Sequence, residues 1–189
     1  SYFWAARWLI NGGRSPSPAT FRIRSWPATG WQIDAQFPKF LPLPARTSRE
    51  SQLGDSIMTA IVLAPLAAHP TRFTALGRLR VQECERVQAL RVELTRCGAQ
   101  VAEQGDTLSI SPTALHGAEI ETYQDHRVAM CFAILGLKIP GIKIKNPACV
   151  KKTFPNFFQK LAAAAPHGLG ATLVDASRRP LTQDELFAD

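Results

Sequence analysis

Four short stretches of the sequence combine acidic, basic and imidazole side chains close to where helices are expected to begin. They are Asp55; Gln82, Glu83 and Arg86; Asp125, His126 and Arg127; and Lys151 and Lys152. A helix start carries unpaired N–H groups and a partial positive charge, so a basic side chain there is locally unfavourable. Basic residues placed against that gradient indicate a shared anionic ligand, such as a phosphate or a carboxylate. Taken singly, each stretch is also consistent with a solvated first turn.

The same stretches hold groups that can exchange protons. Asp55 and Glu83 are carboxylates, and His126 titrates near neutrality. Burial of Lys152 would lower its pKa towards neutrality as well. Proton donors and acceptors beside a bound phosphate indicate chemistry on a phosphorylated substrate. Residue types alone leave the class of reaction open.

From residue 51 onward, helix and strand patterns alternate and would position these stretches. Helices are predicted over 55–67, 81–97, 125–137 and 153–164, and strands over 71–76, 99–103, 107–111, 119–122, 141–145 and 171–175. Asp125 and Thr153 are the expected caps of the last two helices. The clearest helix has Val87, Leu90 and Leu94 on one face and ends before Gly98. This order predicts an α+β fold, in which helices pack together behind a mixed sheet.

Length and composition indicate a globular protein of the cytoplasm. The chain has 189 residues with a net charge of +7, and 46% of its residues are hydrophobic and 20% charged. These values argue against wholesale disorder. No apolar run approaches the ~20 residues that a membrane-spanning helix needs. The four cysteines form no C-x-x-C pair, which argues against a zinc site or a disulfide framework and favours a reducing compartment.

The first fifty residues differ from the rest of the chain. They hold seven basic and two acidic residues, all four tryptophans and six of the fourteen prolines. Between Pro16 and Pro44, the prolines interrupt every window that would otherwise form a helix or a central strand. We therefore expect a poorly ordered or degraded segment over 1–50, a folded domain over 51–165, and a short strand with a polar tail over 166–189. The alternative for 1–50 is a basic, aromatic arm that binds nucleic acid.

Five runs of sequence, in order along the chain, carry a family resemblance. They are S-Y-F-W-A-A at 1–6, D-S-I-M-T-A at 55–60, R-V-Q-E-C-E-R at 80–86, Y-Q-D-H-R-V-A-M at 123–130 and K-T-F-P at 152–155. Together they resemble the motifs of the 5-enolpyruvylshikimate-3-phosphate synthase family, whose members are also called 3-phosphoshikimate 1-carboxyvinyltransferases. The resemblance extends over about residues 51–165, which would form an enolpyruvyl transferase-like domain.

The resemblance implies both a fold and a reaction. The fold would be built of repeated βαβαββ-type units with helices inside and sheets outside, and this chain would be most of the second of two such domains. The reaction would transfer the enolpyruvyl group of phosphoenolpyruvate to the 5-hydroxyl of shikimate 3-phosphate and release phosphate, in aromatic amino acid biosynthesis. The family uses no metal or other cofactor. A separate amino-terminal half is the implied protein partner, and neither a membrane nor a nucleic acid is expected to be one.

The matched positions imply roles for the acid–base candidates. Asp55 would contact the shikimate hydroxyls and accept a proton, and Glu83 would handle protons at the enolpyruvyl carbon. His126 would lie beside the groups that clamp phosphoenolpyruvate.

The remaining matched positions imply contacts to the anionic substrates. Arg86, Arg127 and Lys152 would clamp phosphoenolpyruvate, for which a bidentate arginine suits both the carboxylate and the phosphate. Gln82 stands where the family usually has lysine, which implies weaker binding of shikimate 3-phosphate.

Two other functions stay open. A related enolpyruvyl transferase would act on a nucleotide sugar, although the motifs at 123–130 and 152–155 favour the shikimate branch. A non-catalytic fragment would instead bind nucleic acid through residues 1–50, with an affinity that falls steeply with salt.

Overall fold

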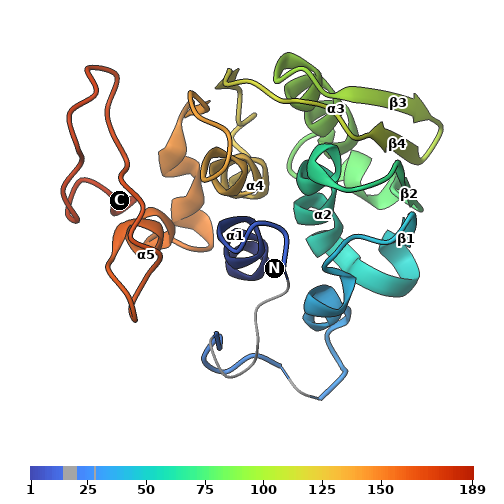
Figure 1. Cartoon of the computed structure of the whole chain (residues 1–189), viewed down its shortest axis with the longest axis horizontal. Coiled ribbons are helices and arrows are strands. Elements are labelled where there is room, and N and C mark those ends of the chain that lie inside the picture. Colours follow the sequence, from blue (N-terminus) through green and yellow to red (C-terminus); the bar gives the residue numbers. More distant parts are fainter. Residues whose placement is uncertain (15–20, 28) are drawn as a thin grey trace.

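A mixed four-stranded sheet covers one side of a group of helices in the computed structural model, which describes residues 1–14, 21–27 and 29–189 (Figure 1). Its strands are β1 (Arg46–Ser48), β2 (Thr71–Thr74), β3 (Gln100–Gln104) and β4 (Thr107–Ser111), in the order β1-β2-β4-β3. β1 runs parallel to β2, and the other neighbours are antiparallel. Phe73, Leu108 and Ile110 are buried on the inner face. The predicted mixed sheet is confirmed, and the strands predicted at 99–103 and 107–111 form the antiparallel hairpin of β3 and β4.

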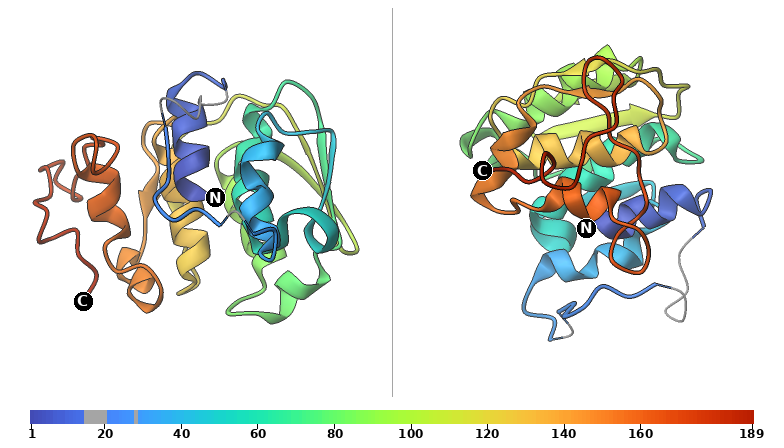
Figure 2. Two further views of the ribbon diagram at one scale, coloured as in Figure 1. Left: turned by 90° about the horizontal axis from the view of Figure 1, so that it is seen from below. Right: turned by 90° about the vertical axis from the view of Figure 1, so that its left-hand side faces the viewer.

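Four helices fill the centre of the molecule, next to the inner face of this sheet (Figures 1 and 2). They are α1 (Tyr2–Ile10), α2 (Ile57–Leu63), α3 (Arg86–Arg96) and α4 (His126–Gly136). All seven residues of α2 are buried, because α1, α3 and α4 surround it. Asp125 caps α4 by accepting hydrogen bonds from the backbone N–H groups of Arg127 and Val128, which confirms the predicted cap.

A smaller, carboxyl-terminal part of the chain lies on the other side of α1 and α4 (Figure 2). It contains the parallel pair β5 (Glu119–Ile120) and β6 (Lys143–Ile144), and helix α5 (Phe157–Ala162). The rings of Tyr2 and Phe157 meet edge to face with centroids 5.8 Å apart, which joins α1 to α5. The chain therefore combines a mixed sheet with packed helices, which is compatible with the predicted α+β class.

Two helices begin later than their sequence patterns predict. The structure places a short 3₁₀ turn, Gly54–Ser56, where the first predicted helix was to start, and α2 follows it. A second 3₁₀ turn, Gly77–Val81, replaces the start of the helix predicted at 81. The α3 helix begins only at Arg86, because the Glu85 carboxylate caps it by accepting from the Gln88 N–H at 2.7 Å. Gln82 and Glu83 consequently lie in a loop rather than on a helix.

Two predictions near the carboxyl end are wrong. Thr153 does not cap α5, because residues 147–152 form a 3₁₀ turn that ends at Thr153, and Asn156 is the cap residue instead. The strand predicted at 171–175 is reduced to a single bridge between Val174 and Pro180. Proline has no N–H to donate, so it cannot extend a strand ladder.

The first fifty residues contribute to the fold, although the three-segment division itself stays a prediction. In α1, Ala5, Ala6, Trp8 and Leu9 are buried against the rest of the core, and β1 pairs with β2. The expectation of a poorly ordered segment therefore does not describe these two elements. Positions 15–20 and 28 of the predicted arm lie outside the described residues. Across the part of the chain that the structure describes, no helix has the length and apolarity to cross a bilayer.

Candidate active site

Apart from Lys151, the site residues predicted from the sequence lie in one network of hydrogen bonds and ion pairs, which we call the charged cluster. It consists of Asp55, Gln82, Glu83, Arg86, Asp125, His126, Arg127 and Lys152. Five separate elements supply these side chains: the turn before α2, the loop before α3, the first turn of α3, the start of α4 and the turn at 147–152. Segments that are up to 97 positions apart in the sequence thus meet at the ends of α2, α3 and α4.

The most deeply buried part of the cluster is an ion pair between Arg86 and Asp125. Arg86 donates from Nε at 2.7 Å and from Nη2 at 3.3 Å to the two carboxylate oxygens of Asp125. Their side chains are 3% and 0% exposed. Burial favours the neutral acid, but the hydrogen bonds and charge of Arg86 outweigh it and hold the pKa of Asp125 below its usual range. One carboxylate therefore both caps α4 and fixes the guanidinium at the start of α3.

Glu83 forms the second part of the cluster by accepting from two bases. His126 Nδ1 donates to Oε2 at 2.9 Å, and Lys152 Nζ donates to Oε1 at 2.5 Å. Burial would raise the pKa of Glu83, but the Lys152 hydrogen bond and the charge of His126 lower it overall. Lys152 is 65% exposed, so its ammonium group can turn towards a ligand. Glu83 therefore links the start of α4 to the turn at 147–152.

Asp55 is surrounded by cations on both of its carboxylate oxygens. Arg49 donates to Oδ1 from Nη2 at 2.7 Å and from Nε at 3.1 Å. On the other oxygen, Gln82 donates at 3.0 Å, and the guanidinium groups of Arg86 and Arg127 approach to 3.5 Å and 3.8 Å. Burial alone would raise the pKa of Asp55, but the hydrogen bonds from Arg49 and Gln82 and the neighbouring charges lower it.

The turn that carries Asp55 depends on the glycine before it. Gly54 has φ +53°, a left-handed conformation that favours glycine, and a Cβ at this position would lie 2.8 Å from an Asp34 oxygen. The other Asp34 oxygen accepts from the Ser56 N–H at 2.6 Å. Asp34 and Gly54 together therefore present Asp55 to the cluster.

The cluster as a whole can bind an anion and exchange protons with it. Arg86 is held rigidly by Asp125, whereas Arg127 is 31% exposed and contacts Asp55 only at the long distance of 3.8 Å. Arg127 and Lys152 can therefore move from their carboxylate partners to a ligand that carries phosphate or carboxylate groups. When they do, Asp55 and Glu83 lose a neighbouring cation and become stronger bases.

The histidine of the cluster makes a testable contribution to stability. Burial lowers the pKa of His126 below its ordinary value of 6.5, and the nearby carboxylates offset this only in part. Between the lowered pKa and 6.5 the unfolded chain binds more protons than the folded chain, so the free energy of unfolding should fall as the pH decreases through this window. Urea unfolding at about pH 7.5 and about pH 5.5 measures the effect.

Two histidine variants separate this contribution from that of other groups. His126→Gln should reduce the pH dependence between these two pH values, whereas replacement of the exposed His167 by glutamine should leave it in place. An unchanged pH dependence in His126→Gln would contradict the assignment.

Comparison with known proteins adds to this geometry. A family model described as EPSP synthase (3-phosphoshikimate 1-carboxyvinyltransferase) matches residues 42–161, which include every member of the charged cluster. The chain belongs to the EPSP synthase family. Among curated relatives, the 3-phosphoshikimate 1-carboxyvinyltransferase of Rhizobium leguminosarum bv. trifolii is 40% identical over 181 residues, which cover 93% of this chain and 41% of the relative. That of Nostoc punctiforme is 44% identical over 110 residues, covering 58% of this chain and 26% of the relative.

A solved EPSP synthase also resembles the fold of this chain. The structure of the enzyme from Acinetobacter baumannii aligns with a TM-score of 0.53 and 31% sequence identity, and the alignment covers 57% of this chain and 26% of that one. The EPSP synthase-like fold is therefore shown for the larger part of the chain. The chain spans less than half the length of the curated EPSP synthases that it matches.

Arg49 joins the site of this EPSP synthase-like chain without having been predicted. It lies in the turn Arg49–Leu53 and makes the shortest contact to Asp55. Nothing in the sequence marks it, because it belongs to the proline- and arginine-rich first segment and to none of the family motifs. Arg49 also lines an open hollow of about 530 Å³, together with Glu50, Ala75, Gly77, Arg78 and Asp106. Of the residues that line this hollow, Arg49 is the one that contacts the charged cluster.

Lys151 is the one candidate from the opening pattern that the cluster does not include. It lies beside Lys152 in the turn Pro147–Lys152, and its side chain is exposed. The idea that basic residues cluster at helix starts is correct for Arg86 and Arg127. It is wrong for Lys151 and Lys152, because α5 begins only at Phe157.

Three residues of the cluster have the donor types of a metal site. The ligand atoms of Glu83, Asp125 and His126 lie within 4.8 Å of one another. However, Glu83 already accepts from Lys152, and Asp125 already accepts from Arg86. The positive charges of Lys152 and Arg86 next to these carboxylates would repel a divalent ion, so the donor set does not suit a metal.

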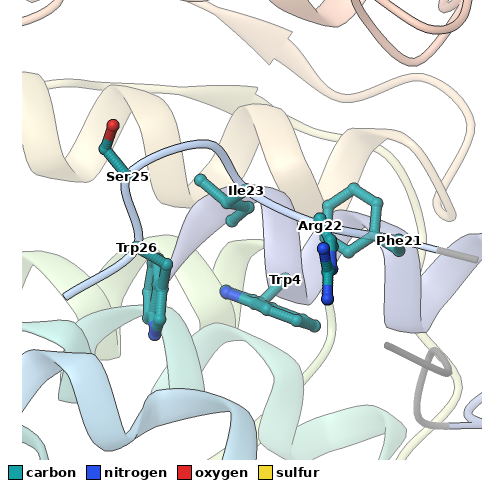
Figure 3. Close-up of a pocket in the computed structure, with 6 residues that line it drawn as sticks. All are labelled: Trp4, Phe21, Arg22, Ile23, Ser25 and Trp26. Carbon is teal, nitrogen blue, oxygen red and sulfur yellow. The ribbon is translucent and has the colours of Figure 1, made fainter. Parts of the chain in front are cut away.

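Aromatic residues near α1 line a second hollow, away from the charged cluster. Its volume is about 340 Å³, and it is lined by Trp4, Phe21, Arg22, Ile23, Ser25 and Trp26 (Figure 3). The ring of Trp4 meets those of Phe21 and Trp26 edge to face, with centroids 5.0 Å and 5.8 Å apart. A stacking platform for bases presents ring faces to the solvent. Because these rings pack on one another instead, this arrangement does not favour the nucleic-acid-binding alternative.

Proposed function

We propose that this chain supplies part of the active site of a 3-phosphoshikimate 1-carboxyvinyltransferase. The enolpyruvyl group of phosphoenolpyruvate is transferred to the 5-hydroxyl of shikimate 3-phosphate, and inorganic phosphate is released. The observation that carries the proposal is the meeting of Arg86, Arg127 and Lys152 with Asp55 and Glu83 in one cluster, each at a position of the family motifs.

The three cations account for the binding of phosphoenolpyruvate. This substrate carries a carboxylate and a phosphate, and a guanidinium group can bind either through two parallel hydrogen bonds. Arg86 is oriented in advance by Asp125, so little side-chain entropy is lost when it binds. Arg127 and Lys152 close on the ligand from α4 and from the turn at 147–152.

The carboxylates account for the proton transfers of an addition followed by an elimination. In the addition, Asp55 accepts the proton of the 5-hydroxyl, whose oxygen forms a bond to the central carbon of phosphoenolpyruvate. The Glu83–Lys152 pair delivers a proton to the methylene carbon. In the elimination, the same pair removes a proton from the resulting methyl group, the carbon–carbon double bond re-forms, and phosphate leaves. His126 orients Glu83 through its hydrogen bond of 2.9 Å.

The second substrate faces Asp55 and Gln82. The side-chain amide of Gln82 is uncharged, so it offers no positive charge to shikimate 3-phosphate. It also already donates to Asp55 and accepts from Arg86. We infer that this substrate binds less tightly than it would with a lysine at position 82. Arg49, at the other oxygen of Asp55, contributes the additional positive charge on this side of the cluster.

The proposal includes a second protein component and a finer description of the fold. Because the matched relatives are more than twice as long as this chain, we propose that a separate amino-terminal half supplies the remaining substrate contacts. The elements from β1 to β4 and from β5 to α5 would then belong to the repeated βαβαββ-type units of one domain. The chain by itself is expected to have no appreciable turnover.

The test is phosphate release from phosphoenolpyruvate and shikimate 3-phosphate by this chain mixed with a separately made amino-terminal half. Release should fall by about a hundredfold or more in Glu83→Ala, because a group that transfers the proton is removed. Glu119→Ala, which removes an exposed carboxylate 3.8 Å from Lys145, should retain activity. No release from a folded mixture would contradict the proposal, and release only with a nucleotide sugar as acceptor would favour the related transferase.

A further inference from the structure

The turn that leads into α4 holds two successive residues in the left-handed region. Tyr123 has φ 53° and Gln124 has φ 55°, and neither is a glycine. Residues with a Cβ rarely adopt this conformation, and they keep it only where the surrounding structure holds them there. The run Asp125, His126 and Arg127 follows directly, so this turn sets the direction in which three members of the charged cluster leave the backbone.

A buried carboxylate on α3 holds this turn in place. The Tyr123 hydroxyl donates to Glu93 Oε1 at 2.8 Å. The other oxygen of Glu93 accepts from the Glu121 N–H at 3.2 Å and from Arg96 Nη1 at 3.0 Å. The Glu93 side chain is 0% exposed, although glutamate is rarely buried without a partner that requires it. Glu121 adds to the hold by accepting from the Tyr123 N–H at 3.3 Å.

Glu93 is one of two attachments between α3 and the start of α4. Arg86 holds Asp125 at the first turn of α3, and Glu93 holds Tyr123 two turns further along. Positions seven apart lie on the same face of a helix, so both attachments face the same segment of chain. Asp125 and Tyr123 flank Gln124, so the left-handed turn is fixed on both of its sides.

We propose that Tyr123 and Glu93 are positioning residues for the charged cluster. Their hydrogen bond fixes the left-handed turn, which in turn places His126 Nδ1 against Glu83 and directs Arg127 towards Asp55. Neither residue needs to contact a substrate. The expected effect on turnover rests on the proposed function, whereas the expected effect on His126 does not.

The test compares the full chain with its Tyr123→Phe variant, which removes one hydroxyl and keeps the ring. In ¹⁵N-labelled protein, the Nδ1–H signal of His126 reports the hydrogen bond to Glu83, and it should shift or broaden in Tyr123→Phe. Val101→Ala removes the apolar contacts of a partly buried residue of β3 away from the cluster, so it controls for a general loss of stability and should leave the signal unchanged. An unaltered His126 signal in Tyr123→Phe would overturn the proposal.

A second variant covers a failure of Tyr123→Phe to fold well. Glycine adopts a left-handed φ without a Cβ penalty, so Gln124→Gly should lower the backbone strain of the turn that the Tyr123 hydroxyl stabilises. Adding Gln124→Gly to Tyr123→Phe should therefore restore both folding and part of the His126 signal. If the folding and the His126 signal of the double variant are the same as or worse than those of Tyr123→Phe, Tyr123 and Glu93 do not stabilise the turn, and the proposal is wrong.

Kinetics in the mixture with an amino-terminal half separate the two proposals. Because Arg127 belongs to the proposed clamp for phosphoenolpyruvate, Tyr123→Phe should raise the KM for phosphoenolpyruvate about tenfold and change the KM for shikimate 3-phosphate much less. An equal change in both KM values would count against positioning of Arg127. If the parent mixture shows no turnover, the proposed function fails, and the His126 signal still decides whether Tyr123 and Glu93 position the cluster.

Discussion

Replacing Asp125 with alanine should lower the free energy of unfolding by about 3–5 kcal/mol, because Nε and Nη2 of the buried Arg86 guanidinium lose the carboxylate that accepts from them. Arg86 is 3% exposed, so water cannot replace the two hydrogen bonds that Asp125 accepts. The same substitution removes the cap of α4, which contributes about 1 kcal/mol in other proteins. A domain of this size has a total stability of roughly 5–15 kcal/mol, so the variant should be close to unfolding.

Urea denaturation followed by circular dichroism measures this change, and a double variant identifies its cause. If the loss comes from an unpaired buried charge, then replacing both partners by apolar residues, as in Arg86→Met with Asp125→Leu, should recover much of the stability. Arg91→Ala, which breaks an ion pair between partly exposed side chains, should cost no more than about 1 kcal/mol. A loss below about 1 kcal/mol in Asp125→Ala would show that Arg86 finds another partner or reaches solvent.

The sequence predicts those elements whose signals are local. The cap at Asp125 followed by an apolar run defines α4, and the Gln104-Gly105-Asp106 turn between two alternating segments defines the hairpin of β3 and β4. Helix starts are harder, because apolar periodicity continues through the 3₁₀ turns that precede α2 and α3. Only the Glu85 cap, which depends on a side-chain rotamer, shows where α3 begins.

The site was predictable from motifs and much less so from charge patterns. The helix-start argument correctly describes Arg86 and Arg127 but not Lys152, which lies at the end of a 3₁₀ turn. Arg49 could not be found, because its contact with Asp55 depends on the shape of the intervening turn. The packing of α1 against α2 and α4 could not be predicted either, because these contacts join segments that are far apart in the chain and because α1 is followed by a proline-rich sequence.

Replacing Arg127 with alanine should lower kcat/KM for phosphoenolpyruvate several-hundredfold in the mixture with an amino-terminal half. In the proposed mechanism, the substitution removes a cation that meets charge developing on the reacting groups, and the loss of one such group costs about 3–4 kcal/mol in the barrier. The fold should not suffer equally. Arg127 occupies the first turn of α4, where a positive charge opposes the helix dipole, and its contact to Asp55 is long at 3.8 Å.

Stability and activity should therefore change independently in Arg127→Ala, and this independence distinguishes a functional arginine from a structural one. The free energy of unfolding should stay within about 1 kcal/mol of the parent value, since an unfavourable helix-start charge and a weak ion pair are lost together. Arg91→Ala serves as the matched control, because it removes a helical arginine of similar exposure whose ion pair is with Glu103 and not with a member of the cluster. If Arg127→Ala keeps full activity, or loses activity only in proportion to a loss of folded protein, Arg127 does not bind the substrate. If Arg127→Ala loses activity while its free energy of unfolding is unchanged, Arg127 contacts the anionic substrate, although its charge is unfavourable at the start of α4.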